Sequence, residues 1–127
     1  MSDRRRVSSG SPYEGRYGYC RAVRAGDRIV VSGTVAIWPD GSCDPDPGVQ
    51  AGRCLEIIER AIQDLGGTLS DVIRTRMMIV DREDQDAVGR AHQAVFGDTP
   101  PASTMVVVAG LLDERWKVEI EAEARLG

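Results

Sequence analysis

The spacing of apolar residues along the chain switches between two periods, and each switch marks a change of element. Residues 17–24 alternate between apolar and polar positions, and residues 28–37 are rich in β-branched side chains. The tight-turn sequence Ala25-Gly26-Asp27 stands between them. Two strands joined by so short a turn predict a β-hairpin. A further short strand is expected at residues 5–8.

Residues 38–48 are rich in proline, aspartate and glycine, and this composition predicts a loop. From Val49 onward, apolar residues recur at spacings of three and four as far as Leu65, and charged residues occupy the other side. Gly66-Gly67 follows directly. The pattern predicts an amphipathic helix that ends at these glycines. Its apolar face consists of Ala51, Cys54, Leu55, Ile58, Ala61, Ile62 and Leu65.

A strand, a helix and another strand are predicted next. The strands are residues 71–80 and residues 102–109; the second is apolar on both faces, so we expect it to be buried on both sides. Asp81 or Asp84 can cap the helix between them, which ends at Gly97. The residues expected to face inward on this helix are Ala87, Val88, Ala91, Val95 and Phe96.

Residues 116–125 predict a last strand, in which the aliphatic residues from Val118 to Ala124 alternate with charged ones. The order of elements predicts an α+β fold, a single domain over residues 1–127, with the helices on one face of the sheet. The apolar run Met105 to Val108 is larger than a one-sided sheet should expose. We therefore expect self-association to cover the second face.

Composition excludes several classes of function. The net charge is −4, and Arg4-Arg5-Arg6 is the one basic cluster, so nucleic acid is not an expected partner. The single histidine, His92, leaves no histidine pair for a metal, and the cysteines form no Cys-x-x-Cys motif. We expect neither a disulfide nor a metal site. The sequence has no leader-like segment and no run of 18 apolar residues, so we expect a cytoplasmic protein without a membrane partner.

A set of short motifs follows one another along the chain. These motifs are Gly18-Tyr19, Val31-Ser32-Gly33-Thr34, residues 54–67, Val72-Ile73-Arg74-Thr75-Arg76, Val80-Asp81, Phe96, Pro101-Ala102 and Val118-Glu119-Ile120-Glu121-Ala122. In their order and spacing they make the chain resemble the RidA family, also called the YjgF/YER057c/UK114 or L-PSP family. The resemblance implies a chorismate-mutase-like fold, with a mixed sheet of about six strands and two helices on one face. It also implies a homotrimer in which three sheets close into a barrel, with ligand clefts between subunits.

Active members of that family hydrolyse 2-imino acids to 2-keto acids and ammonia without a cofactor. In those enzymes an arginine after Pro-Ala pairs with the substrate carboxylate, which suits a planar guanidinium. Here Ser103 holds that position, and Met105 stands where a cysteine is common. A glutamate that handles water is matched by Glu119. Pocket residues of the family are matched by Tyr19, Ser32 and Gly33.

The resemblance thus implies Glu119 as a catalytic residue and Tyr19, Ser32, Gly33, Ser103, Thr104 and Met105 as substrate-binding residues. For Glu119, the alternative is a solvated charge on a strand face. For Ser103 and Thr104, the alternative is local hydrogen bonding at a strand end. Another arginine can replace the missing one, and the candidates are Arg21, Arg74, Arg76 and Arg115.

Three functional hypotheses remain open at this level. The first is a hydrolase or deaminase that acts on an imine, enamine or related C–N bond, with an altered substrate because of Ser103. The second is a homotrimer that binds a small molecule in the same clefts without catalysis. The third is the ribonuclease or translation-inhibitor role attached to the family, which the acidic charge and the lack of a histidine pair disfavour.

Overall fold

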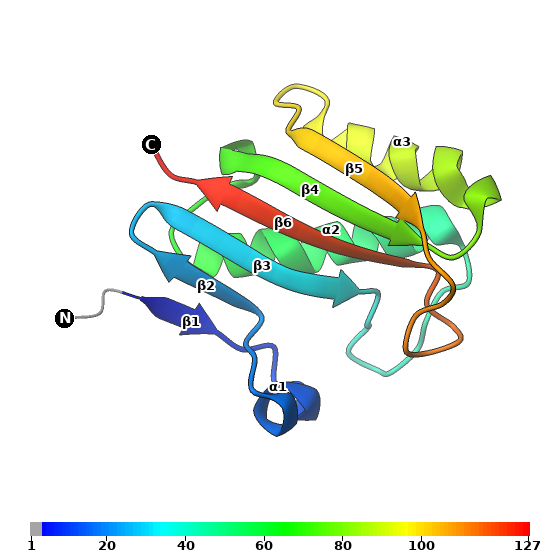
Figure 1. The fold of residues 1–127 in the computed structure, drawn as a ribbon, viewed down its shortest axis with the longest axis horizontal. Coiled ribbons are helices and arrows are strands. Elements are labelled where there is room, and N and C mark those ends of the chain that lie inside the picture. Colours follow the sequence, from blue (N-terminus) through cyan, green and yellow to red (C-terminus); the bar gives the residue numbers. More distant parts are fainter. Residues whose placement is uncertain (1–3) are drawn as a thin grey trace.

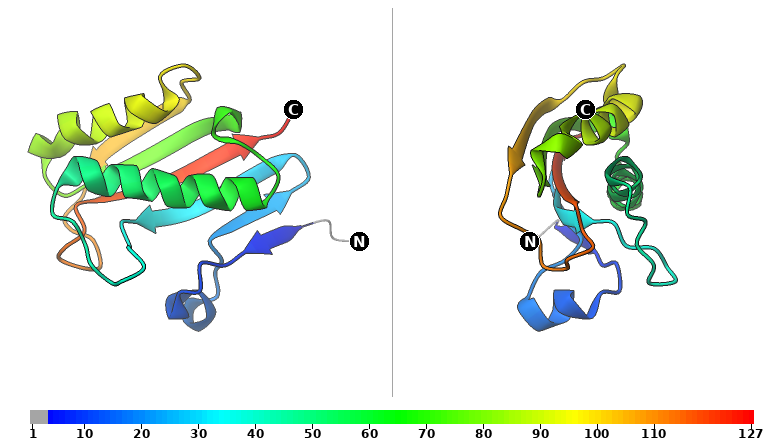
Figure 2. Two further views of the ribbon diagram at one scale, coloured as in Figure 1. Left: turned by 180° about the vertical axis from the view of Figure 1, so that it is seen from behind. Right: turned by 90° about the vertical axis from the view of Figure 1, so that its right-hand side faces the viewer.

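The structure, a computed structural model, describes residues 4–127. Its strands form one mixed sheet in the order β1-β2-β3-β6-β4-β5, and the long helices α2 and α3 lie on one face of it (Figures 1 and 2). Strands β4 and β5 are parallel, and the other neighbours are antiparallel. The predicted α+β fold is confirmed. The strands are β1 (Arg5–Val7), β2 (Ala22–Ala25), β3 (Arg28–Val35), β4 (Val72–Ile79), β5 (Ala102–Val107) and β6 (Val118–Arg125).

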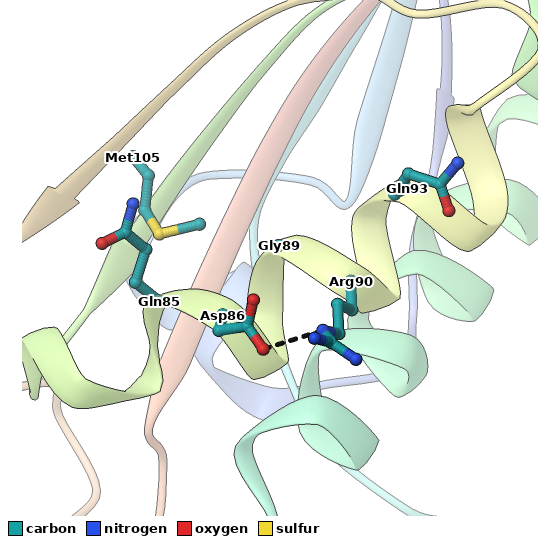
Figure 3. A pocket seen from close by; sticks show the side chains of 6 residues that line it. All are labelled: Gln85, Asp86, Gly89, Arg90, Gln93 and Met105. Carbon is teal, nitrogen blue, oxygen red and sulfur yellow. Dashed lines mark ion pairs between the residues drawn. The ribbon is translucent and has the colours of Figure 1, made fainter.

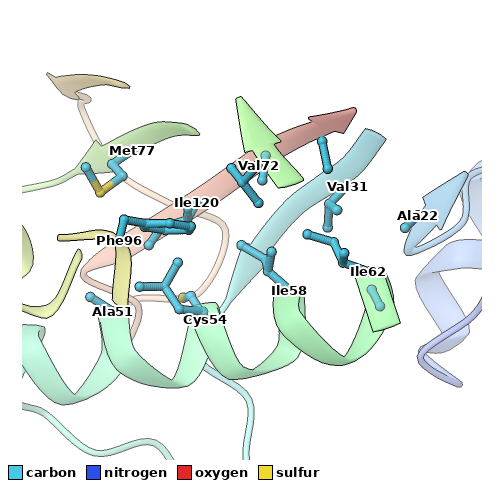
Figure 4. Close-up of a cluster of buried hydrophobic side chains, with 14 of the residues drawn as sticks. Ala22, Val31, Ala51, Cys54, Ile58, Ile62, Val72, Met77, Phe96 and Ile120 are labelled. Atoms are coloured by element: carbon cyan, nitrogen blue, oxygen red, sulfur yellow. The ribbon is translucent and has the colours of Figure 1, made fainter. Parts of the chain in front are cut away.

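Helix α2 (Pro47–Asp64) confirms the amphipathic pattern. The Asp46 side chain caps its first turn by accepting a hydrogen bond from the backbone N–H of Val49. All the apolar positions predicted for it are buried, and they pack between the helix and the sheet (Figure 4). Cys54 lies in this core, where burial raises the pKa of its thiol to about 12. The thiol is therefore unreactive, as expected for a core cysteine.

The strand predicted over residues 17–24 is wrong in its first half. A short helix, α1 (Pro12–Tyr17), ends where the predicted strand begins, and residues 18–21 lead from it to β2 without regular structure. Ser11 accepts a hydrogen bond from the N–H of Tyr13, and Gly18 ends the helix in the left-handed region with φ 76°. Proline at the first helical position and glycine after the last one favour a helix over the alternation that follows.

Helix α3 (Gln85–Phe96) ends at Gly97 as predicted, and its buried residues are Val88 and Phe96. Val95 was expected to face inward, but it is 36% exposed, because this helix covers only the margin of the sheet. Of the two expected caps, Asp84 precedes the helix without a side-chain hydrogen bond. Asp81 instead caps the short 3-10 turn η2 (Arg82–Asp84), and a similar turn, η1 (Leu69–Asp71), precedes β4.

Strand β5 is not buried on both sides in the single chain, so that prediction is wrong at this level. It is the edge strand of the sheet, with only β4 beside it. Val106 and Val107 are 42% and 52% exposed. A long apolar edge strand with unpaired backbone groups is a surface that proteins normally cover.

The alternation predicted for the last strand is confirmed in β6. Its aliphatic residues pack under the helices, and Glu119, Glu121 and Glu123 point to the other face of the sheet. Both long helices lie on the first face (Figure 2), and we call the other face, to which these glutamates point, the open face. Within residues 4–127, no helix has the length and apolar character needed to cross a membrane.

Candidate active site

A β-bulge in β3 prepares one part of the candidate site. The register between β3 and β6 shifts between Val31 and Thr34, so Ser32 and Gly33 form the bulge. The Ser32 N–H donates to the Arg21 carbonyl at 2.9 Å. Its hydroxyl donates to the carbonyl of Cys20 at 2.7 Å. These bonds fix the bulge against the segment that leads into β2.

The carboxylate of Glu119 packs directly against Gly33. A Cβ built on Gly33 would overlap Glu119 Oε2 and lie 3.1 Å from Cδ. The φ of Gly33 is not positive, so the backbone conformation itself does not demand glycine. Glycine is needed here for the close approach of the carboxylate.

Glu119 differs electrostatically from the other two glutamates of the open face. Glu121 pairs with Arg76 at 3.0 Å, and Glu123 pairs with Arg28 at 2.7 Å. Glu119 is half-buried and forms no ion pair within residues 4–127. Burial raises its pKa above that of an ordinary carboxyl group, the charge of Glu121 adds to this, and Arg21 partly opposes it. Such a carboxyl group suits general acid–base chemistry.

Arg21 is the arginine that the structure brings to Glu119. Its Nη2 donates to the Gly33 carbonyl at 3.1 Å, and its guanidinium lies 6.0 Å from the centre of the Tyr19 ring. Its Nε is buried and has no hydrogen-bond partner among the residues described. Arg21 thus connects Tyr19, the bulge and Glu119 in one cluster.

Of the other three candidate arginines, two line a hollow that also includes Ser32 of the bulge, and one lies in a loop. Arg74 and Arg76 line a hollow of about 180 Å³ on the open face, where Arg76 holds Glu121. Arg115 lies in the loop before β6 and pairs with Asp113 at 3.0 Å. Arg76 and Arg115 thus form the exposed ion pairs that such residues usually form.

The residues of β5 divide between the two faces of the sheet. Ser103 pairs in register with Thr75, which lies beneath the helices, whereas Thr104 pairs with Arg76 on the open face. Met105 lies on the helix side again. A single chain therefore places Ser103 and Met105 on the opposite face of the sheet from Glu119.

On the helix side, Met105 borders an open hollow of about 510 Å³ between β5 and α3 (Figure 3). Met105 and Gln85 lie together at one end of it, and Asp86 and Arg90 form an ion pair along its helical wall. The hollow is polar on the helix and apolar at Met105. It is a surface that can receive part of a ligand next to the β5 edge.

Two residues near Ser103 were not proposed from the sequence. The Thr75 hydroxyl lies 2.8 Å from Ser103 Oγ and also 2.8 Å from His92 Nε2. The sequence shows a lone histidine on a helix, but it does not show which strand register that helix covers. Among residues 4–127, no group of three or more His, Cys, Asp or Glu side chains is placed to hold a metal ion.

The chain is similar in sequence to several known proteins. A family model described as Endoribonuclease L-PSP matches residues 12–126. Protein SCO2049 of Streptomyces coelicolor is 44% identical over 128 residues, which cover 97% of this chain and 92% of that protein. The 2-iminobutanoate/2-iminopropanoate deaminase of Escherichia coli is 30% identical over 110 residues, which cover 84% of this chain and 85% of the deaminase.

Among solved structures, Rv2704 of Mycobacterium tuberculosis is described as a member of the YjgF/YER057c/UK114 family. It is 40% identical to this chain, and the match covers 98% of this chain and 100% of Rv2704, with a TM-score of 0.90. The fold described above is therefore shared over nearly its whole length.

Proposed function

Because the chain belongs to the endoribonuclease L-PSP family, also known as the RidA or YjgF/YER057c/UK114 family, we propose that it is a deaminase that hydrolyses an imine, enamine or related C–N bond. The observation that carries this proposal is the half-buried Glu119 carboxylate, held against Gly33 with a raised pKa and no ion pair among the residues described. The relative named 2-iminobutanoate/2-iminopropanoate deaminase supports the reaction class.

In the proposed reaction, Glu119 acts as the general base and then as the acid. Its carboxylate accepts a proton from a water molecule while the water oxygen bonds to the imine carbon and the C=N π electrons move to nitrogen. The same proton can pass from Glu119 to that nitrogen. The hydroxyl group of the resulting carbinolamine then gives its proton to Glu119, which passes it to the nitrogen. The C–N bond breaks as the new C=O bond forms, and ammonia leaves. The balance is one imine and one water to one carbonyl compound and one ammonia, without any oxidant, reductant or cofactor.

We place the complete site between copies of the chain. Ser103 and Met105 lie on the opposite face of the sheet from Glu119, so one chain cannot present both sets to one small molecule. A neighbouring copy that covers the exposed β5 edge can bring its own Glu119, Ser32, Gly33 and Tyr19 to that edge. This arrangement supports the homotrimer with clefts between subunits, and it would bury the valines that β5 exposes.

Substrate choice follows from the residue at position 103. A serine provides one neutral donor, whereas a guanidinium provides a charged, bidentate clamp for a carboxylate. We expect ordinary 2-imino acids to be poor substrates of the wild-type protein. Ser103→Arg is expected to raise kcat/KM for 2-iminobutanoate by about tenfold, the effect of one charge-assisted hydrogen bond.

The test is keto-acid release from imines generated freshly in the assay, with the uncatalysed rate subtracted. The panel contains 2-iminobutanoate and imines that lack a carboxylate. Turnover of 2-iminobutanoate by the wild type as fast as by Ser103→Arg would contradict the substrate assignment. If every imine is left untouched while a keto acid still binds, the chain is a binding protein, not a deaminase.

The close contact at Gly33 gives a second prediction. Gly33→Ala is expected to displace the Glu119 carboxylate and to lower imine hydrolysis by about 10²-fold, as misplaced catalytic groups do. The free energy of unfolding should change by less than about 1 kcal/mol, because the added methyl group meets the end of a flexible side chain. Urea unfolding and the imine assay on the same preparation measure both. Gly52→Ala is a matched control, since nothing lies within 4 Å of its Cβ position.

A further inference from the structure

Three side chains from three elements form a hydrogen-bonded chain under the β5 edge. Ser103 of β5, Thr75 of β4 and His92 of α3 are joined at the Thr75 hydroxyl, with both distances 2.8 Å. Along this chain Ser103 is exposed, Thr75 is buried and His92 is half-buried. A buried hydroxyl group therefore connects a surface hydroxyl group to a half-buried imidazole ring.

The protons in this chain can be assigned. The geometry makes the Thr75 hydroxyl the donor to Ser103 Oγ, which uses the single proton that this hydroxyl has. His92 Nε2 lies at hydrogen-bond distance from the same oxygen, so this nitrogen must carry a proton and donate it. The Ser103 hydroxyl proton is not used within this chain, so it is free to be donated to another group. Burial lowers the pKa of His92, which favours the neutral ring at pH 7.

We propose that Ser103 presents this hydrogen-bond donor to an acceptor oxygen of the substrate, and that Thr75 and His92 are positioning residues that hold its direction. The inference rests on the proposed function in taking Ser103 to face the substrate. It adds the substrate class: a carbonyl or single carboxylate oxygen at this edge, not an ammonium or another group that only donates. Hydrogen bonds arranged in one direction also polarise each other, which strengthens the last donor.

Two further observations support a binding role. Valine has nearly the shape of threonine and would fill the buried position 75 without a polar group. Threonine is present instead, and its hydroxyl group has Ser103 and His92 as partners. Met105, two residues after Ser103 on the same side of β5, borders the hollow of about 510 Å³. A ligand held at Ser103 thus has room for its remaining atoms.

The first test is independent of any activity. His92 is the only histidine of the sequence, so a preparation without a histidine tag gives one set of imidazole ¹⁵N signals. We expect the neutral ring to carry its proton on Nε2 in the wild type. Ser103→Ala should lose the preference for this tautomer, because the Thr75 hydroxyl proton is then free to turn toward Nε2, and Thr75→Val should lose it as well. A wild-type ring protonated on Nδ1 would overturn the proposal.

The second test adds ligands. Titration with 2-oxobutanoate or butanamide, which both carry acceptor oxygens, is expected to shift the His92 signals of the wild type. Butylamine, which has no acceptor oxygen, should leave them in place. The shift should be absent in Ser103→Ala, an exposed position at which folding is not at risk. No response of the wild type to either acceptor ligand, or an equal response of Ser103→Ala, would overturn the proposal.

Activity, where it is found, gives a third readout. His92→Gln keeps an N–H donor and should hold the KM of the imine substrate within about twofold, whereas His92→Leu should raise it roughly fivefold, the value of one neutral hydrogen bond. An equal rise in both variants would mean that the ring only fills space. If the ¹⁵N results are as expected but no imine is hydrolysed, the proposed function fails while this inference stands.

Discussion

Glu119→Gln is expected to lower the rate of imine hydrolysis by about 10²–10⁴-fold, the usual contribution of a general acid–base group. The amide cannot accept a proton from water, although it keeps the shape of the carboxylate against Gly33. In the wild type, kcat/KM should fall as the pH drops through the pKa of Glu119, which burial raises above the ordinary carboxyl value. In Glu119→Gln this acidic limb should vanish. Keto-acid release measured across the pH range provides both results.

Glu123→Gln is the matched control, because Glu123 lies on the same face of β6 but its carboxylate pairs with Arg28. It should retain the wild-type rate and pH profile. Equal losses in the two variants would show that the charge of the open face matters and that Glu119 has no special role. A wild-type rate in Glu119→Gln would remove Glu119 from the mechanism altogether.

Stability should respond to Glu119→Gln in a defined direction. The folded-state pKa of Glu119 is raised, so the folded chain holds this proton more tightly than the unfolded chain does. The stabilisation from this group is therefore complete below the unfolded-state pKa and is lost as the pH rises through the folded-state pKa. At pH 7 the variant should be no less stable than the wild type, so that a loss of activity cannot be ascribed to unfolding.

Gln50→Leu is expected to lower the free energy of unfolding by about 3 kcal/mol, because it leaves three backbone groups without their partner. Gln50 is fully buried. Its Nε2 donates to the carbonyls of Asp44 and Arg115 at 2.8 and 2.9 Å. Its Oε1 accepts from the N–H of Lys117 at 2.8 Å. One side chain of α2 thus fixes the loop before the helix and the segment that leads to Glu119.

The midpoint of urea unfolding, at an unchanged m-value, measures this effect. Gln63→Leu, at an exposed position of the same helix, is the control, and it should change stability by no more than about 0.5 kcal/mol. A loss below about 1 kcal/mol in Gln50→Leu would mean that water replaces the side chain at the loop carbonyls. Leucine is close to glutamine in size, so a loss of stability in Gln50→Leu cannot be ascribed to a cavity.

Local patterns were enough to predict most of the elements. Helix α2 and strand β6 each have one side packed against the same hydrophobic core. Their apolar residues therefore recur with the period of a helix or a strand, and the sequence shows that period directly. The same reasoning missed α1, because the capping residues Ser11 and Gly18 outweigh the alternating residues beside them. It also placed Val95 inward. The period of a helix shows which side faces the sheet, but it does not show how much of the helix surface the sheet covers.

The candidate site divides in the same way. The sequence by itself determined the fold class, the α2 core and the presence of Glu119 on the polar side of its strand, since these follow from periodicity and from the resemblance. Only the tertiary structure decided that Gly33 touches Glu119, that Arg21 is the arginine beside it, and that Ser103 lies on the opposite face of the sheet with Thr75 and His92. Those relations depend on a bulge, a parallel register and the position of a helix over an edge strand. They arise between segments far apart in the chain, where no local spacing of residues records them.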